Sequence, residues 1–218
     1  MKQLLKFFIC ITLWVSSSLG SGQTNVVTLP SGLGDIQLGI GLGDFFREKK
    51  EAKRFDLSGK RADVSSTAAE QLLYEKLSTD PFFGHAFYHF HASRLQTIVL
   101  VGEVKRNEWA VRQNEFLARC IGWWGSPSEL LVVELDEGKG TSFSPALVWR
   151  TNDRLIAAAF TGELAEGRAK GTLHLKLHAN PKADMSLLFQ IPGIGERKRE
   201  ELLKPLRIQL EHLTAGNK

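Results

Sequence analysis

The apolar and polar residues of this 218-residue chain change period several times, and each change predicts a different element. Residues 83–101 alternate between apolar and polar with a break at 91–94, which predicts a β-hairpin. From Trp109 to Trp124 the apolar residues recur at helical spacing, while Arg112, Glu115 and Arg119 lie on the other side. This segment predicts an amphipathic helix that Asn107 caps and that ends at Gly125.

Two helices are predicted before the hairpin. Residues 36–44 lead into a short helix over 45–50. Thr67 and Glu70 have the spacing of a capping box, and Leu72, Leu73 and Leu77 follow at helical spacing, which predicts a second helix over 67–78.

Four apolar segments separated by short turns follow Pro127, at 130–135, 146–151, 155–161 and 172–179. Closely spaced strands of this kind predict an antiparallel meander. The chain is therefore expected to have an α+β fold, in which helices pack on one face of an antiparallel sheet made of the hairpin and the meander. Helix-then-strands order occurs twice, over 36–104 and 107–179, which suggests a tandem arrangement.

The ends of the chain carry further signals. Lys2 and Lys6, an apolar run over 7–15 and small residues up to Gly20 are typical of a signal peptide over 1–20. We expect a flexible tether over 21–35, the α+β domain over 36–180, and over 181–218 a turn and an amphipathic helix that bends at Pro205 and packs on the domain. The protein is thus predicted to be exported, either periplasmic or secreted, with no membrane-spanning segment after the signal is removed.

Removing the signal changes the charge and the cysteine content. The formal charge falls from +4 to +2, and Cys120 becomes the single cysteine, so the mature chain forms no internal disulfide. Residues 47–61 hold seven basic side chains against three acidic ones. This run is either a solvated surface or a surface for anionic lipid, nucleic acid or a protein partner.

Several short segments together resemble the small exported SmpA/OmlA-like and β-lactamase-inhibitor-like domains. They are residues 36–40, 94–100, 117–127, and the strand of Trp149 with its partner 155–157. The resemblance covers most of 36–161 and implies a non-catalytic scaffold or protein-binding module with helices on an antiparallel sheet. The chain lacks the cysteine that follows the signal in the lipoprotein members.

Five histidines fall in two predicted strands and form a candidate site for zinc or copper. Because alternate residues of a strand share a face, histidines two residues apart can direct their imidazoles to one metal ion. The alternative is that they are polar residues on the solvated face of a sheet. The candidate ligands are His85, His89, His91, His174 and His178.

Residues 189–203 resemble a helix-hairpin-helix DNA-binding motif, whose loop offers backbone N–H groups to a phosphate. Pro192, Gly193, Ile194 and Gly195 match the loop, and Arg199 stands where the motif has a small residue. Arg197 and Lys198 would complete a DNA-binding surface. The alternative is a turn that caps the terminal helix.

The sequence contains no Gly-x-Ser-x-Gly, Walker or His-Glu-x-x-His motif, and no cofactor is implied. We therefore expect a non-enzymatic module that binds a protein or envelope component, with DNA binding and metal binding as alternatives. Trp123 lies off the apolar stripe of its helix and is a candidate partner surface. The other candidate contacts are in the basic run, namely Arg47, Lys49, Lys50, Lys53 and Arg54.

Overall fold

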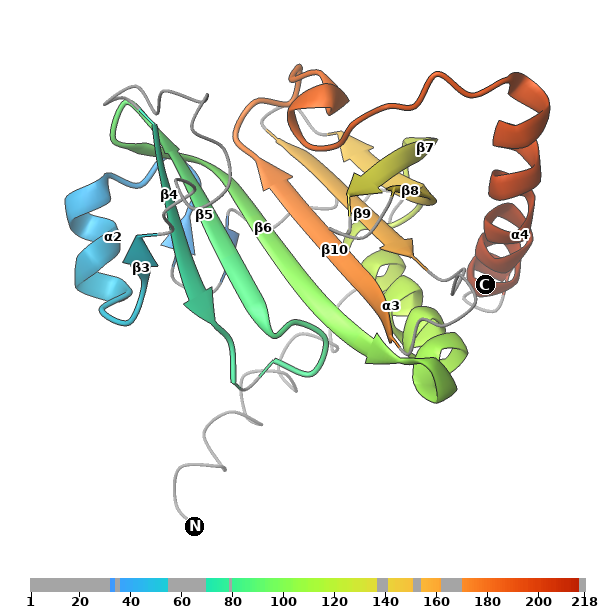
Figure 1. Cartoon of the computed structure of the whole chain (residues 1–218), viewed down its shortest axis with the longest axis horizontal. Helices are drawn as coiled ribbons and strands as arrows, with labels where there is room; N and C mark the ends of the chain where they lie inside the picture. Colours follow the sequence, from blue (N-terminus) through green and yellow to red (C-terminus); the bar gives the residue numbers. More distant parts are fainter. Residues whose placement is uncertain are drawn as a thin grey trace, which may run out of the picture.

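The computed structural model describes residues 32–33, 36–54, 70–78, 80–136, 141–150, 154–161 and 170–215. The predicted signal 1–20, most of the tether, Lys60, Arg61 and Thr67 lie outside these residues, as do 137–140, 152–153 and 162–169 of the predicted turns. Within the described ranges, an antiparallel sheet of eight strands is accompanied by three α-helices (Figure 1). The predicted α+β fold is confirmed.

The elements follow one another in two similar sets. The first set follows a small β1–β2 pair (Gly32–Leu33 and Ile36–Gln37) and consists of α2 (Leu42–Glu48), β3 (Lys53–Arg54), β4 (Glu70–Lys76), β5 (His85–His91) and β6 (Arg94–Lys105). The second set consists of the 3₁₀ turn η2 (Arg106–Glu108), α3 (Trp109–Trp124), β7 (Glu129–Asp136), β8 (Thr141–Arg150), β9 (Leu155–Thr161) and β10 (Lys170–His178). The 3₁₀ turn η3 (Met185–Leu187) and α4 (Glu196–Ala215) complete the described chain.

The two sets join through their last strands. The strand order is β3-β4-β5-β6-β10-β9-β8-β7, and β6 pairs with β10 from Lys105 opposite Lys170 to Thr97 opposite His178. Each set contributes one helix followed by four strands, so the predicted tandem arrangement is present in the fold.

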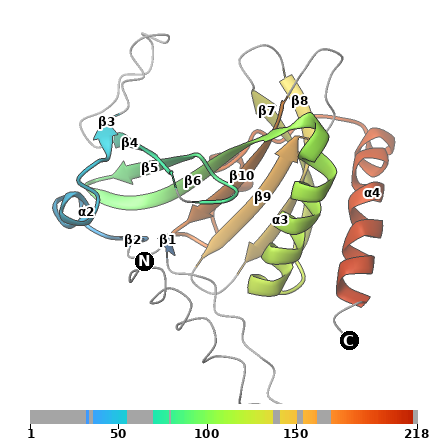
Figure 2. The ribbon, with the colours of Figure 1, turned by 90° about the horizontal axis from the view of Figure 1, so that it is seen from below.

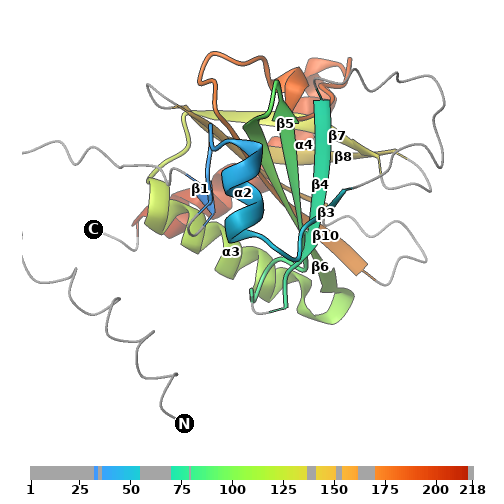
Figure 3. The same cartoon turned by 90° about the vertical axis from the view of Figure 1, so that its left-hand side faces the viewer.

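The α-helices cover one face of the sheet and enclose the larger core. Phe45 of α2, Phe116 and Leu117 of α3, and Leu206 of α4 are buried in this core with side chains of β4, β5, β6 and β10. Figure 2 shows α4 beside α3, and Figure 3 shows α2 in the foreground at the end of the sheet that carries β3 and β4. Leu206 and Leu210 thus place α4 against the larger core.

A segment without α-helix covers part of the opposite face. Residues 180–190, which we call the strap, cross the sheet after β10 and bury Ala183, Met185, Leu188 and Phe189. These side chains pack on apolar residues of β7, β8 and β9, which form a second core. The sheet is thus covered by helices on one face and by the strap on part of the other.

One predicted helix is wrong. Residues 70–76 form β4, which pairs with β5 so that Leu73 lies opposite Tyr88. Leu73 is buried beneath the helices, whereas Leu72 and Tyr74 lie on the other face, because successive side chains of a strand alternate. Leu72 and Leu73 therefore lie on opposite faces of a strand rather than on one face of a helix.

The bounds of other elements differ slightly from expectation. Helix α3 begins after Glu108 rather than at Asn107, and the residue before it makes no side-chain capping hydrogen bond. Strand β8 begins at Thr141, five residues before the predicted start. Helix α4 extends on both sides of Pro205.

Candidate functional site

Trp123 lies on the outer surface of α3. The buried side of this helix carries Trp109, Phe116, Cys120 and Trp124, and Trp123 falls outside that stripe because successive helical residues are about 100° apart. Its side chain is 51% exposed, which is unusual for so large an apolar group. The exposure predicted from the helical period is therefore observed.

Arg119 and Phe82 lie next to Trp123. The Arg119 guanidinium carbon is 4.6 Å from the centroid of the Phe82 ring and 5.6 Å from that of Trp123. Such cation–π contacts hold a guanidinium against aromatic faces while its N–H groups remain able to donate. Within the described part of the chain, Arg119 has no hydrogen bond or ion pair, so its donors are open to a ligand. We call the exposed Trp123 and Arg119, together with the buried Phe82 ring that Arg119 contacts, the Trp123 surface.

The Trp123 surface rests on well-packed residues. Trp123 contacts the buried Trp124 ring at 5.6 Å between centroids, and Trp124 meets Trp149 edge to face at 5.1 Å. Trp149 Nε1 donates to the carbonyl of Gly125, the residue that ends α3 with a φ of 69°. On the other side, Asp80 Oδ1 accepts from the N–H of Phe82 at 2.8 Å. Both aromatic groups of the surface are therefore held from behind.

The basic residues predicted as partner contacts are on α2, on β3 and in the turn between them, away from α3 in the fold (Figure 2). Arg47 pairs with Asp44 at 2.8 Å and is exposed, as are Lys50, Lys53 and Arg54. Lys49 instead reaches Glu75 on β4 at 3.1 Å. The structure does not bring this basic surface together with Trp123.

Lys49 has a structural role. Glu75 accepts from Lys49 and also from the hydroxyl of Tyr88 at 2.7 Å, which connects α2 to β4 and β5. Burial, and then the hydrogen bond to Glu75, raise the pKa of Tyr88 well above its ordinary value. Tyr88 thus remains a neutral donor in this contact.

The sheet arranges the histidines in two rows. His85 and His174 flank Val101, and His89 and His178 flank Thr97, so all four lie on the face opposite the helices. His91 is next to the hairpin turn, where its Nδ1 is 3.8 Å from a Glu70 carboxylate oxygen. The register thus places the histidines of β5 and β10 on a common face, as their parity predicted within each strand.

Several of these imidazoles are already engaged. His85 Nδ1 is 2.8 Å from the Tyr74 hydroxyl, and His178 Nδ1 accepts from the N–H of Asn180 at 2.9 Å. Among the described residues, no three His, Cys, Asp or Glu side chains gather as a group that could hold a metal ion. The described histidines of β5 and β10 lie in pairs rather than in groups of three, so metal binding stays a prediction without structural support.

Burial lowers the pKa of two histidines on β10. The pKa of His174 is about 4, first because the ring is desolvated and then because the Lys176 charge is close. The pKa of His178 is lowered by burial and by His89. Both rings are therefore neutral near pH 7.

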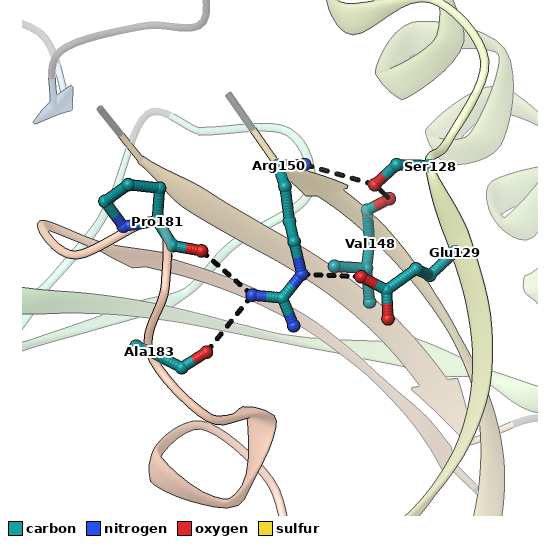
Figure 4. A network of polar contacts seen from close by, with 6 residues as sticks. All are labelled: Ser128, Glu129, Val148, Arg150, Pro181 and Ala183. Carbon is teal, nitrogen blue, oxygen red and sulfur yellow. Dashed lines mark hydrogen bonds and ion pairs between the residues drawn. The ribbon is translucent and has the colours of Figure 1, made fainter. Parts of the chain in front are cut away.

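Arg150 and Lys176, which were not predicted as site residues, hold the strap, and Figure 4 shows the contacts of Arg150. Arg150, at the end of β8, donates from Nη1 to the carbonyls of Pro181 at 2.9 Å and Ala183 at 3.1 Å, and from Nε to Glu129 at 2.5 Å. Lys176 donates to the carbonyl of Leu188, with its Nζ 3.9 Å from the centroid of the Phe189 ring. The available sequence signal for Arg150 was a basic residue that directly follows the apolar residues 146–149.

The predicted DNA-binding loop precedes α4 but follows no α-helix. Residues 188–195 connect the short η3 turn to α4, and the N–H of Arg199 bonds to the carbonyl of Gly195. Gly193 and Gly195 are exposed, and Ile194 is half-buried. Arg197 pairs with Glu201 at 3.2 Å, and Lys198 Nζ lies 4.5 Å from the Phe143 ring centroid. The loop therefore lacks the first helix of the motif in the described structure, and DNA binding stays a prediction.

No family model, curated protein or solved structure matches the chain. None of the helices in the described ranges is both long and apolar enough to span a membrane.

Proposed function

We propose that this protein is an exported, non-catalytic module that binds another protein through the Trp123 surface. The observation that carries the proposal is the exposed Trp123 indole, whose position is fixed by Trp124 behind it and by Arg119 beside it. Tryptophan and arginine are the residues that most often dominate the energy of protein interfaces. A side chain that is already ordered loses little entropy on binding, which favours affinity.

The chemistry of the Trp123 surface indicates the kind of partner. The indole face would pack against an apolar side chain of the partner, and burying it would contribute about 2 kcal/mol. The open N–H donors of Arg119 match a carboxylate, which a guanidinium binds in bidentate geometry. We therefore propose a partner that presents an apolar side chain next to an Asp or Glu.

Two parts of this proposal come from the sequence. The signal-like segment 1–20 supports export, and the absence of the enzyme motifs named above supports a non-catalytic role. The resemblance to exported scaffold domains agrees with both.

The test is binding to a partner captured from envelope extract by cross-linking and then purified. Trp123→Ala is expected to weaken binding at least tenfold, and Arg119→Gln several-fold, because each removes a central contact. Val111→Ala is the matched control, since Val111 is 61% exposed on the same helix but lies away from Trp123. Equal affinity of the Trp123→Ala variant and the wild type would contradict the proposal.

Tryptophan fluorescence gives an independent readout. Of the tryptophans in the described residues, Trp109, Trp124 and Trp149 are buried, so acrylamide quenching reports mainly on Trp123. A partner that covers the Trp123 surface is expected to reduce this quenching in the wild type. A Trp123→Phe variant should show little quenching with or without the partner.

A further inference from the structure

The strap begins at a turn that is joined to the sheet through His178. The N–H of Asn180 donates to His178 Nδ1 at 2.9 Å. Asn180 in turn accepts from the N–H of Lys182 at its side-chain oxygen, at 2.9 Å, and from the N–H of Ala183 at its carbonyl, at 3.1 Å. The position of Asn180 therefore organises the whole turn 180–183.

The contact with Asn180 requires one protonation state of His178. A ring nitrogen accepts a hydrogen bond only when it carries no proton, so the neutral ring must hold its proton on Nε2. An imidazolium carries N–H groups at both nitrogens. Its Nδ1–H would face the N–H of Asn180, so the hydrogen bond is lost when His178 becomes charged.

The surroundings of His178 hinder the ring from turning away. The ring is buried at the end of β10, in a cross-strand row with Thr97 of β6 and Leu155 of β9. The register places three basic groups on the same face near His178, namely His89 on β5, Lys176 on β10 and Arg150 on β8. Arg150 is paired with Glu129, and the strap that follows carries Lys182 and Asp184, so no carboxylate is placed against the ring among these contacts.

The remaining anchors of the strap do not titrate in acid. Arg150 and Lys176 stay charged below neutral pH, and they hold Pro181, Ala183 and Leu188 by their carbonyls. The strap is also joined to β7, where the N–H of Glu134 donates to the carbonyl of Gln190 at 2.7 Å. Loss of the His178 contact therefore loosens the start of the strap first.

We propose that His178 is a pH-sensitive latch whose protonation in mildly acidic solution releases Asn180 from the sheet and loosens the turn that Asn180 organises. In neutral solution the latch is closed, and Ala183 stays buried on the second core. In acid the turn loosens at Asn180, whereas Arg150 still holds the carbonyls of Pro181 and Ala183. The device is independent of the partner proposed for the Trp123 surface.

The test combines two measurements by NMR on the whole protein. The ¹⁵N shifts of His178 report its tautomer and its titration, and hydrogen exchange reports the protection factors of the Asn180, Lys182 and Ala183 amides. Between pH 7.5 and pH 5 these factors are expected to fall about tenfold, which corresponds to the loss of one hydrogen bond. The amides of Ile156 and Ala158 on β9 should keep their protection.

The matched variant is His178→Asn, because the Asn side-chain oxygen can take the place of Nδ1 as acceptor but does not titrate. Its turn should stay protected at pH 5, and a His91→Asn control should behave as the wild type does. The proposal is overturned by an Nδ1–H tautomer at neutral pH or by a His178 that stays neutral down to pH 4. An equal loss of protection in wild type and His178→Asn would also overturn it.

Discussion

Gly102 shows how a single residue positions the Trp123 surface. It is buried on β6, and a Cβ atom at this residue would overlap the carbonyl oxygen of Phe82. The absence of a side chain lets the segment before β5 lie directly against the strand, which places Phe82 and Phe83 beneath α3. The sequence pattern of the hairpin contained no sign of this approach, because the two segments are about twenty residues apart.

Gly102→Ala is expected to destabilise the protein by about 3 kcal/mol, because the Phe82 backbone would have to move. Urea unfolding of the variant and the wild type measures this difference. Gly43→Ala is the control, since a Cβ there meets no atom within 4 Å and alanine favours the helix. A loss below 1 kcal/mol would show that the segment can shift without cost.

His174 makes the stability depend on pH. Its pKa is about 4 in the folded protein, below the ordinary value of about 6.5, so folding favours the neutral ring. The contribution is fully present above pH 6.5 and is lost as the pH falls towards 4. Because the ring is partly accessible, we expect the loss to be about 2 kcal/mol.

Urea unfolding at pH 7 and pH 4.5 tests this expectation. In a His174→Gln variant the decrease in stability between these values should be smaller than in the wild type. His91→Gln is the control, because His91 is exposed. An identical pH dependence in wild type and His174→Gln would contradict a neutral, desolvated His174.

At the scale of elements, the sequence predicted segments with one clear period well and a segment with an ambiguous period poorly. The hairpin, α3 and the strands of the meander have patterns that fit one kind of element, so they were predictable. At strand β4, Leu72, Leu73 and the following Leu77 fit a helix as well as a strand. Its identity comes from pairing with β5, which no local pattern contains.

The candidate sites also divide into features that local sequence periods predict and contacts that only the folded chain creates. The exposure of Trp123 and the shared parity of the histidines depend on local periods and were predictable. The Arg119 cation–π contacts and the His178 latch depend on loops that fold back on the sheet, so their partners were not predictable.

The turn between β5 and β6 offers a way to stabilise the fold. Ala92 and Ser93 have φ values of 47° and 61°, although residues with a Cβ disfavour this region. Hydrogen bonds from Leu42 N–H to the Ser93 carbonyl and from Arg94 to the Gly39 carbonyl keep the turn in place. The two positive φ values match a type I′ turn, for which Asn-Gly is the preferred pair.

Replacing Ala92 with Asn and Ser93 with Gly is expected to raise the unfolding free energy by about 1 kcal/mol. Thermal unfolding should show a melting temperature a few degrees higher than that of the wild type. The same Gly replacement at Ser126, outside this turn, should give no such gain. A lower melting temperature for the turn variant would show that the Ser93 side chain has a stabilising role.

At the scale of the whole molecule, the order of the strands is the feature that local patterns do not contain. The hairpin and the meander were predicted separately, and the fold joins them by placing β10 against β6 rather than leaving either strand at an edge. This pairing connects residues about seventy apart in the chain. It brings the β5 and β10 histidines onto one face and positions the strap that follows β10.

The pairing of β6 with β10 also gives the sheet an approximate twofold arrangement. Two sets of one helix and four strands face each other across this antiparallel pair, with α2 and α3 on the same side of the sheet. This is the geometry of a twofold dimer in which equivalent strands pair across the axis. Without this pairing each set would end in an unpaired last strand, which is an adhesive edge. The pairing instead leaves β3 and β7 as the edges of the sheet, so each half protects the exposed edge of the other.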